Sequence, residues 1–445
     1  MRPATRAAAV GLVAAALLAP LPGAVGAATP SAAASAAAGT AAIAAAPAVA
    51  PVPAATSWGP SRILLTPTTD MATSQEVSWT MPARLKGQRV QYRTVGGPVQ
   101  SARASRRPAT KKATSGTTRP RYEATLTGLT PGTAYQYRVV TRRGASSWRT
   151  FTTANPAATT TTLIALGDTQ VDNRGVPRRT IRRALADAPQ ASLVLQAGDV
   201  VNRPTSIRQW DDLFAAIGTS GRTRNWVVSI GNHEQCVLTR CESNAGEAFR
   251  SYFDWPTNGF PDQGETWFAV DHEGVRIVVL DSFGGRMAEQ AQFLDQALAG
   301  NPNRWSIVLM HAPPFASQPN RPNPDVVAQW LPILEARNVD LVLTGHDHSY
   351  ARGYHRRANG PVYVTSVSGP KYYDVTDADW VANKATRVSW AAGTSTYQVI
   401  TIAGEQLTYR AVVSARGATS TSPFGPGGVL DQFTIDKSGG RKIVR

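Results

Sequence analysis

The sequence reads Gly345-His346-Asp347-His348-Ser349-Tyr350-Ala351-Arg352 directly after an apolar run at residues 339–343, which predicts a short buried strand. Two imidazoles two residues apart, just past the end of a strand, can both turn toward one point. Neutral imidazole is the commonest protein ligand for a transition metal. The chain has six histidines, so this pair is unusual, but a polar loop with incidental histidines explains it as well. The rest of the chain has to decide between a metal site and a plain loop.

Four other strand-like runs end in the same kind of polar element. They are followed by Gly167-Asp168-Thr169-Gln170, Gly198-Asp199, Gly231-Asn232-His233-Glu234 and His311-Ala312-Pro313. In open α/β sheets a binding site lies outside the carboxyl ends of the strands. Each element alone is explained by a turn, a helix cap or a buried histidine. Five such elements in the same position favour one shared site.

Helical patterns alternate with these strands between residues 154 and 445. The helical patterns cover residues 176–188, 207–217, 246–253, 288–299 and 324–336, and the strand-like runs cover 163–166, 193–195, 227–230, 276–280, 307–310 and 339–343. Later runs at 397–402 and 407–413 predict a hairpin, and 429–435 predicts a final strand. This alternation predicts an α/β domain in which helices cover β-sheets.

The first 27 residues have the pattern of a secretory signal peptide. Arg2 and Arg6 precede an apolar run at residues 7–18, and residues 25–27 fit a cleavage site. A membrane anchor is the alternative, but about a dozen apolar residues are short for a span of roughly twenty. Residues 28–57 are rich in Ala and Pro without any charge, which predicts a linker. We therefore expect a secreted, extracellular protein with no transmembrane segment in its mature form.

Residues 58–153 change to short alternating runs separated by turn residues, which predicts an all-β antiparallel sandwich. Examples are the runs at 61–65, 76–80, 89–93 and 134–140. The run at 126–137 resembles the corner between two strands in fibronectin type III domains, and Trp79 is similar to the core tryptophan of that family. This resemblance concerns the fold alone, because folds of this kind host many functions.

The formal net charge of +16 is unevenly distributed. Residues 58–153 hold 16 Lys+Arg against 3 Asp+Glu, whereas residues 154–445 hold 28 against 27. A field of this sign favours an anionic partner, such as a cell-wall or surface polymer or lipid headgroups. The alternative is a solvated basic face with no partner, and no specific nucleic-acid recognition is predicted.

The two cysteines, Cys236 and Cys241, enclose only four residues. An export signal places them in an oxidising compartment, which favours a disulfide around a tight loop. A metal role for the pair is less favoured, because thiolate sites usually contain more soft ligands.

Taken in order, the strand-end elements resemble the calcineurin-like metallophosphoesterase superfamily. The set consists of two Gly-Asp elements, Gly-Asn-His-Glu, a lone histidine after a strand, and Gly-His-x-His. Residues 345–352 are most similar to the purple acid phosphatase branch, which also carries a fibronectin-like domain before the catalytic domain. The resemblance implies a four-layer αββα sandwich at residues 154–445 that holds two metal ions.

The resemblance also assigns roles to individual residues. Asp199 would bridge the two ions, because a carboxylate has two oxygens and can span a pair about 3.5–4 Å apart. The first ion would be completed by Asp168 and His348, and the second by Asn232, His311 and His346. His233 is the family's candidate to protonate the leaving group or to contact the phosphoryl oxygen, and its alternative role is to orient a ligand.

Two positions depart from the purple acid phosphatase pattern. Asn202 stands where that branch has the tyrosine whose phenolate binds ferric iron, so the purple colour is not expected. Gln170 stands where many members of the superfamily have a metal-binding histidine, and its amide oxygen can serve as a ligand. These residues favour a divalent pair of Fe, Zn or Mn. Whether Gln170 or Asn202 binds metal stays open.

The implied activity is a phosphomonoesterase of the acid phosphatase type that uses a metal-bridged hydroxide to release phosphate from organic phosphates. A phosphodiesterase acting on nucleotides or phospholipids is the alternative, and a non-enzymatic cell-wall-binding protein is a third. Weaker candidates for substrate binding are Asn202, Tyr350, Arg352 and Lys371, with the alternatives that Tyr350 and Arg352 brace the histidine loop and that Lys371 lies in a plain loop. Of these, Lys371 would meet substrate phosphate at the rim of the site.

Overall fold

The computed structural model describes residues 59–107, 119–235, 246–259, 265–356 and 359–445. The predicted signal peptide and linker lie outside the described residues, and so do Cys236 and Cys241. None of the helices in the described part of the chain is long and apolar enough to cross a membrane.

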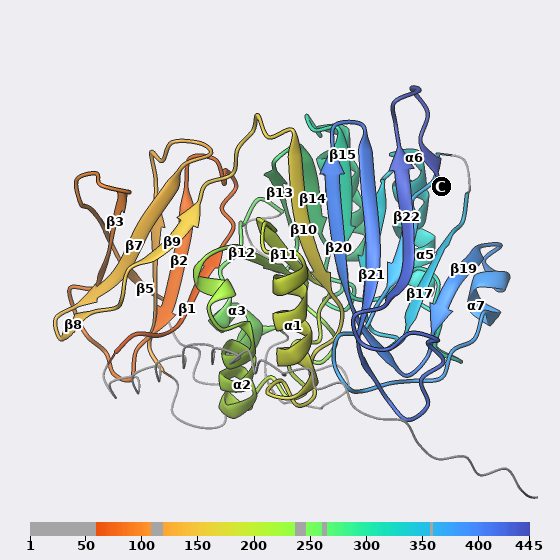
Figure 1. Cartoon of the computed structure of the whole chain (residues 1–445), viewed down its shortest axis with the longest axis horizontal. Coiled ribbons are helices and arrows are strands. Elements are labelled where there is room, and N and C mark those ends of the chain that lie inside the picture. The colour runs from red at the N-terminus through yellow and green to blue at the C-terminus, as the bar shows by residue number, and fades with distance from the viewer. Residues whose placement is uncertain (1–58, 108–118, 236–245, 260–264, 357–358) are drawn as a thin grey trace, which may run out of the picture. The chain divides into compact units, whose positions relative to one another are not determined.

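The strands between residues 61 and 152 form a β-sandwich of two antiparallel sheets (Figure 1). One sheet has the order β1-β2-β6-β5, and the other has the order β4-β3-β7-β8 with β9 paired to β7. The predicted all-β sandwich is confirmed. Its strands are β1 Ser61–Thr66, β2 Gln75–Thr80, β3 Arg89–Thr94, β4 Gln100–Arg103, β5 Ser105–Arg107, β6 Arg121–Leu126, β7 Ala134–Thr141, β8 Gly144–Ala145 and β9 Arg149–Thr152.

Aromatic residues fill the core of the sandwich, and their polar atoms are paired. The indole Nε1 of buried Trp79 donates a hydrogen bond of 2.7 Å to Gln88 Oε1. The backbone N–H of Thr130 donates to the hydroxyl of Tyr135 at 2.9 Å. A tyrosine that bonds back to the backbone a few residues upstream pins the corner between two strands in immunoglobulin-like sandwiches.

Two seven-stranded sheets make up the rest of the fold. The first sheet has the order β12-β11-β10-β20-β21-β22-β23, and the second has the order β13-β14-β15-β16-β18-β17-β19. The first contains β10 Thr160–Leu166, β11 Leu193–Gln196, β12 Asn225–Val228, β20 Thr394–Ala403, β21 Gln406–Arg416, β22 Val429–Asp436 and β23 Ile443–Val444. The second contains β13 Phe268–His272, β14 Val275–Val279, β15 Trp305–Leu309, β16 Leu341–Thr344, β17 Tyr350–Tyr354, β18 Val362–Thr365 and β19 Thr386–Ala391.

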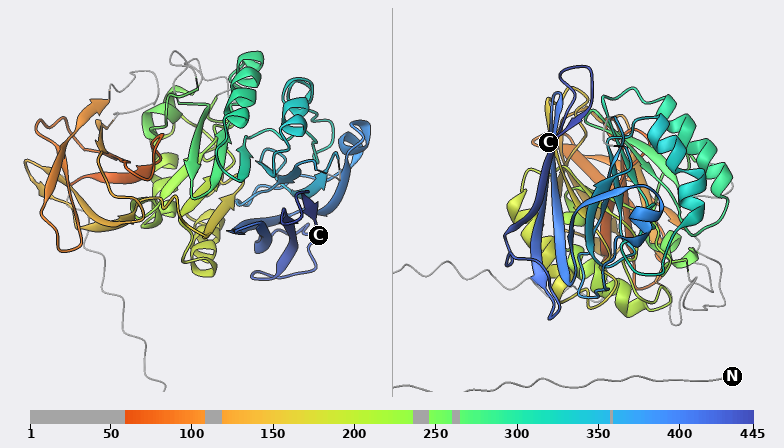
Figure 2. Two further views of the ribbon diagram at one scale, coloured as in Figure 1. Left: turned by 90° about the horizontal axis from the view of Figure 1, so that it is seen from above. Right: turned by 90° about the vertical axis from the view of Figure 1, so that its right-hand side faces the viewer.

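Helices cover the outer faces of both sheets, so the predicted four-layer αββα order is confirmed (Figure 2). In the first sheet, α1 packs on β20 and β21 and also on α2; in the second, α4 packs on β14 and on α5 and α6. The helices are α1 Val176–Asp187, α2 Ile207–Ile217, α3 Glu247–Tyr252, α4 Met287–Ala299, α5 Pro324–Gln329, α6 Leu331–Ala336 and α7 Ala378–Ala382, and a short 3-10 turn lies at Ser220–Arg222.

One sequence prediction about the second sheet needs correction. The helix expected over residues 324–336 is interrupted at Trp330, because Pro332 has no N–H to continue the helical hydrogen bonds. After the histidine motif, Tyr350 begins strand β17, which pairs with β18 and β19.

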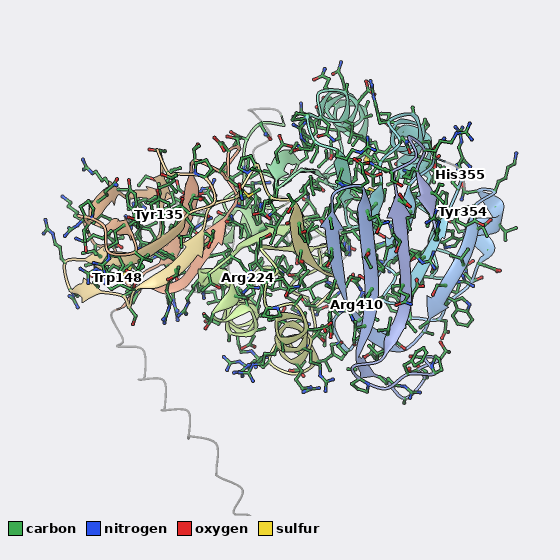
Figure 3. All side chains as sticks on the ribbon, turned by 45° about the horizontal axis from the view of Figure 1, so that its top comes forward. Tyr135, Trp148, Arg224, Tyr354, His355 and Arg410 are labelled. Carbon is green, nitrogen blue, oxygen red and sulfur yellow. The ribbon has the colours of Figure 1, made fainter. Side chains whose placement is uncertain are left out.

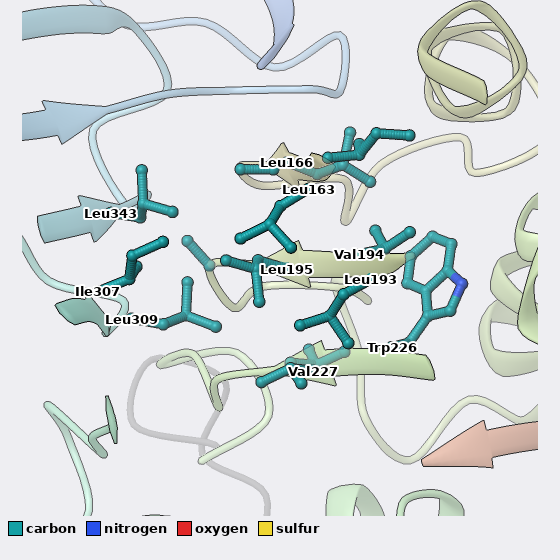
Figure 4. Close-up of a cluster of buried hydrophobic side chains, with 14 of the residues drawn as sticks. Leu163, Leu166, Leu193, Val194, Leu195, Trp226, Val227, Ile307, Leu309 and Leu343 are labelled. Carbon is teal, nitrogen blue, oxygen red and sulfur yellow. The ribbon is translucent and has the colours of Figure 1, made fainter. Parts of the chain in front are cut away.

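The inner faces of the two sheets share one hydrophobic core (Figure 4). Aliphatic side chains from β10, β11 and β12 face those of β15 and β16, and the core includes Leu163, Leu193, Val227, Ile307 and Leu343. Because both faces of these strands are buried, the runs are apolar throughout instead of alternating. This core holds the carboxyl ends of the five strands in place.

Candidate metal centre

The five polar strand ends predicted from the sequence meet at one place. Asp168 follows β10, Asp199 follows β11 and Asn232 follows β12, all in the first sheet. His311 follows β15, and His346 and His348 follow β16, in the second sheet. None of these six side chains is more than 3% exposed. The backbone N–H of His346 donates to Asp168 Oδ1 at 2.8 Å, which joins the two sheets at the site.

Ligand atoms of both sheets face one another across short distances. Those of Asp168, Asp199 and His311 lie within 4.8 Å of one another. His311 Nε2 lies 3.3 Å from Asp199 Oδ2 and 3.2 Å from Asn232 Oδ1. His348 Nε2 lies 3.3 Å from Asp168 Oδ2. Atoms that share an ion at about 2.1 Å are separated by about 3 Å, so the spacing suits metal coordination.

Unpaired buried polar atoms also fit a metal site. Asp168 Oδ2 and Asn232 Nδ2 are buried without any hydrogen-bond partner. A buried carboxylate oxygen without a partner is costly, and a cation offsets this cost. The donor set of carboxylates, imidazoles and amides suits borderline divalent ions.

Gln170 lies within the same cluster. Its Nε2 lies 2.9 Å from Asp199 Oδ2 and 3.0 Å from His348 Nε2. The nitrogen and oxygen of an amide are assigned from the hydrogen-bond network and exchange places by a flip. With the amide turned over, Oε1 would face the two ligands, so the position of Gln170 is compatible with metal ligation.

Three of the cluster residues have left-handed backbone conformations. The φ angle is +45° at Asp199, +73° at His346 and +51° at His348. Residues with a Cβ rarely adopt this region, and such strain is concentrated at functional sites. The strained backbone thus lowers the stability of the fold and fixes the direction of these side chains.

Two glycines allow the close approach of backbone to ligand. A Cβ on Gly345 would lie 2.2 Å from Asp168 Oδ1, and one on Gly231 would lie 2.2 Å from Asp199 Oδ1. No side chain fits at such distances. This explains why glycine precedes the ligands at both strand ends.

The cluster is electrostatically strained without a cation. Burial raises the pKa of Asp168 to about 7, and the nearby Asp199 adds to the rise. Burial opposes ionisation of Asp199, but the imidazoles of His311 and His233 lower its pKa below the usual range. Burial also lowers the pKa of His311, but Asp199 and Asp168 outweigh this and raise it to about 9. The two carboxylates thus favour a positive charge at this position, which a bound cation would supply.

Comparison with known proteins agrees with this geometry. Residues 161–350 match the calcineurin-like phosphoesterase family, and residues 60–153 match the N-terminal domain of purple acid phosphatases. The chain carries a calcineurin-like phosphoesterase domain. The predicted family is therefore confirmed.

Individual relatives match over part of their length. The uncharacterized protein Rv2577 of Mycobacterium tuberculosis (strain ATCC 25618 / H37Rv) is 30% identical over 169 residues, which is 33% of this chain and 31% of that protein. Purple acid phosphatase 18 of Arabidopsis thaliana is 26% identical over 189 residues, 39% of this chain and 43% of that protein. The chain thus spans about a third to two fifths of the length of these relatives.

Solved structures show the same fold. Purple acid phosphatase PPD1 from yellow lupin seeds superimposes with a TM-score of 0.69 at 17% identity, over 85% of this chain and 74% of that one. PhoD superimposes with a TM-score of 0.64 at 14% identity, over 88% and 93%. At these identities the likeness concerns the architecture.

In the phosphoesterase domain, backbone carbonyls orient the imidazoles. His311 Nδ1 lies 2.6 Å from Ala197 O, and His348 Nδ1 lies 3.0 Å from Lys371 O. When Nδ1 carries the proton and donates it to a carbonyl, Nε2 is left as the free electron pair that faces the site.

His233 follows the same pattern beside the cluster. Its Nδ1 lies 2.8 Å from the backbone oxygen of Asn202, and its Nε2 lies 3.8 Å from Asp199 Oδ2. Its backbone N–H donates to Asp199 Oδ1 at 3.0 Å. The second nitrogen of His233 therefore faces the site, where it can exchange a proton. Asn202 contributes its backbone oxygen here. The predicted role of its side chain in substrate binding stays a prediction.

The structure contradicts the predicted substrate role of Tyr350 and Arg352. The side chain of Tyr350 is fully buried, and its hydroxyl donates to Asp431 Oδ2 at 2.7 Å. Arg352 forms two hydrogen bonds to the same carboxylate, at 2.5 and 2.9 Å, and lies over the ring of Phe433. Both residues link β17 to β22 and so brace the two sheets.

Lys371 does reach the site, and two further residues there were missed. Lys371 Nζ lies 3.4 Å from Gln170 Oε1. Arg321 donates to the backbone oxygen of His346 at 3.1 Å, and the ring of Tyr373 packs edge-on against that of His348, with 4.6 Å between ring centroids. Arg321 and Tyr373 belong to no motif, and their proximity arises from contacts between distant segments.

Proposed function

We propose that this chain is a secreted, metal-dependent phosphoester hydrolase that releases phosphate from organic phosphate monoesters. The observation that carries the proposal is the buried cluster of carboxylates, imidazoles and amides at the carboxyl ends of five strands. Its residues are Asp168, Gln170, Asp199, Asn232, His311, His346 and His348. The match of residues 161–350 to calcineurin-like phosphoesterases supports this chemistry.

We infer that the cluster holds two divalent ions from the Fe, Zn and Mn group, with Asp199 between them. Such ions act as Lewis acids toward water and phosphate oxygens and offset charge in the transition state. The protein supplies ligands whose free electron pairs are already aimed by Ala197 O and Lys371 O. We infer export from the basic and then apolar pattern of residues 1–27.

His233 is proposed as the residue that moves a proton. Its Nδ1 proton is engaged by Asn202 O, so Nε2 is the nitrogen that gives or takes a proton at the site. The leaving alkoxide of a phosphate ester needs a proton, and a positioned imidazole supplies one near neutral pH. His233→Gln keeps a hydrogen-bonding side chain but cannot titrate, and is expected to lower kcat more for poor leaving groups than for nitrophenolate.

The test of the main proposal uses two ligand variants and one control. Asp199→Ala and His311→Ala are expected to lose bound metal and to reduce kcat on p-nitrophenyl phosphate by at least about a thousandfold, because both residues are proposed as direct metal ligands. Asp295→Ala removes a carboxylate that is 45% exposed on α4 and should behave as wild type. Full turnover in both ligand variants would disprove the site.

A phosphodiesterase remains the alternative for the same cluster. The metal-loaded protein should hydrolyse p-nitrophenyl phosphate with a higher kcat/KM than bis(p-nitrophenyl) phosphate. The reverse order would favour the diester activity. If a chelator removes neither activity, the reaction does not depend on metal.

A specific observation also favours an anionic polymer as partner of the sandwich. Strands β3, β4, β7 and β9 carry no carboxylate. Trp148 lies at the outer end of the sandwich (Figure 3), and the guanidinium carbons of Arg93 and Arg138 lie 4.7 and 4.5 Å from its ring centroid. The Nε atoms of the two arginines donate to Gln136 and Gln91, which leaves the terminal nitrogens for phosphate groups.

We propose that this Arg93–Trp148–Arg138 stack binds a phosphate-bearing wall polymer. The double variant Arg93→Gln/Arg138→Gln should weaken co-sedimentation with teichoic acid-bearing wall material at low salt, since charge pairing dominates such binding. Arg179→Gln/Arg182→Gln, two exposed sites on α1, is the matched control. Equal binding by both double variants would leave the sandwich without this partner.

A further inference from the structure

Two cations lie at the edge of the metal-ligand cluster without a carboxylate of the described residues within ion-pair distance. Among the described residues, Arg321 and Lys371 form no ion pair at hydrogen-bond distance, although burial raises the pKa of Asp347 and Arg321 partly offsets that rise, and both cations are half-buried. Taking a cation partly out of water is costly unless an anion offsets it. The two cations therefore leave hydrogen-bond donors that an added anion could use.

Arg321 contacts the loop that carries His346. Its Nη1 donates to Gln318 Oε1 at 2.6 Å and to the backbone oxygen of His346 at 3.1 Å. Its Nη2 lies 3.4 Å from His346 Nδ1. The guanidinium therefore borders a ligand of the cluster directly and has donors left for another group.

Lys371 borders the cluster beside Gln170 and His348. Its Nζ lies 3.4 Å from Gln170 Oε1, and its backbone oxygen lies 3.0 Å from His348 Nδ1. An ammonium has three donors, so it can bind a phosphate oxygen in either orientation of the Gln170 amide.

Both cations lie near the ring of Tyr373. The guanidinium carbon of Arg321 lies 5.7 Å from the ring centroid, and Lys371 Nζ lies 5.3 Å from it. The ring itself packs edge-on against His348. Because a cation is attracted to the face of an aromatic ring, Tyr373 steadies both charges beside the cluster before any substrate arrives.

We propose that Arg321 and Lys371 are substrate-binding residues that select phosphate monoesters over diesters. The inference rests on the proposed phosphoesterase function. A monoester phosphate has three non-bridging oxygens and carries up to two negative charges, whereas a diester phosphate has two such oxygens and one charge. When two oxygens face the metal-ligand cluster, only the monoester has a third oxygen left for the guanidinium or the ammonium. Charge-assisted hydrogen bonds of this kind are the strong ones.

The experiment compares Arg321→Gln and Lys371→Gln with the wild type on two esters. On p-nitrophenyl phosphate each variant should lose about 10–100-fold in kcat/KM, the loss typical of a hydrogen bond to a charged group. On bis(p-nitrophenyl) phosphate the loss should stay below about threefold, because the diester lacks the third oxygen. Arg182→Gln and Lys86→Gln, two exposed positions, are matched controls that should lose nothing.

A binding measurement separates this inference from the proposed function. Inorganic phosphate should raise the midpoint of thermal unfolding of the metal-loaded wild type, and should raise it less in Arg321→Gln and Lys371→Gln. Equal losses on both esters, or an unchanged phosphate effect in both variants, would overturn the selectivity role. If the wild type cleaves neither ester, the proposed function fails, and the phosphate effect then still tests the two residues.

Discussion

Substitution of Arg352 tests whether this residue has a structural or a catalytic role. It stands four residues after a predicted metal ligand, yet it forms a paired hydrogen bond with Asp431 at 2.5 and 2.9 Å. The side chains of Arg352 and Asp431 are only 14% and 8% exposed. Arg352→Met keeps most of the aliphatic chain but leaves the carboxylate without its cation. We expect a loss of stability with no change in kcat/KM.

The magnitude follows from burial. Removing one partner of a buried ion pair costs about 3–5 kcal/mol, because the other charge is left uncompensated. We take the lower end, about 3 kcal/mol, because the hydroxyl of Tyr350 still donates to Asp431. For a domain of this size, that change lowers the unfolding midpoint by about 5 °C.

The chain offers a matched control with the same geometry at the surface. Arg337 bonds Asp295 through Nε and Nη2 at 2.7 and 2.8 Å, but these side chains are 37% and 45% exposed. An exposed pair of this kind contributes about 0–1 kcal/mol. Arg337→Met should therefore shift the unfolding midpoint by less than about 2 °C.

The assay combines thermal unfolding by circular dichroism with kcat/KM at 25 °C, where all variants are folded. The double variant Arg352→Met/Asp431→Asn should recover part of the loss, since no charge is then left alone. A tenfold drop in kcat/KM for Arg352→Met at an unchanged unfolding midpoint would refute the structural role. Equal destabilisation by Arg352→Met and Arg337→Met would refute the argument from burial.

Three further changes test other parts of the structure. Gly345→Ala places a Cβ 2.2 Å from Asp168 Oδ1 and should lower metal content and kcat/KM at least about tenfold, whereas Gly439→Ala, with open space around it, should change neither. Chelation should abolish hydrolysis, and one of Fe, Zn or Mn should restore it, as measured by metal analysis of the same sample; activity without metal would contradict the proposed chemistry. Burial lowers the pKa of Lys442 to about 8, so the folded state binds fewer protons than the unfolded state between that pH and about 10.4. The contribution of Lys442 to stability should therefore rise with pH across this window by about 3 kcal/mol in total, so denaturant titrations should show the wild type gaining on Lys442→Met by about that amount.

The strand ends were predictable because each is a local signal. A buried apolar run followed by glycine and a polar residue specifies both a strand and the direction of the next side chain, and parallel strands bring their carboxyl ends to one edge. Asp168, Asp199 and Asn232 meet for this reason. The helix break at Trp330 was less visible, since the amphipathic pattern continues through it and only Pro332 marks the interruption.

The errors at the site arose where sequence distance was taken for distance in space. Tyr350 is two residues from His348, but the start of strand β17 turns its side chain into the core between the sheets. Arg321 is 25 residues from His346 and still contacts it, because the segment after β15 folds back over the loop that carries His346. No periodicity or motif marks such a contact, and only the packed chain shows it.

The orienting groups of the site are backbone atoms, and this matters for how its side chains can be tested. The imidazoles of His311, His348 and His233 face the carbonyls of Ala197, Lys371 and Asn202. Each carbonyl belongs to a loop that also carries another residue of the site or its edge. A substitution of the Lys371 side chain therefore removes the ammonium but keeps the carbonyl that aims His348. If Lys371→Gln loses monoester activity and keeps its metal, the ammonium acts on the substrate. If the metal is lost as well, the side chain supports the loop that carries the carbonyl. The two outcomes can be told apart because the Lys371 carbonyl, which orients His348, is kept in the variant.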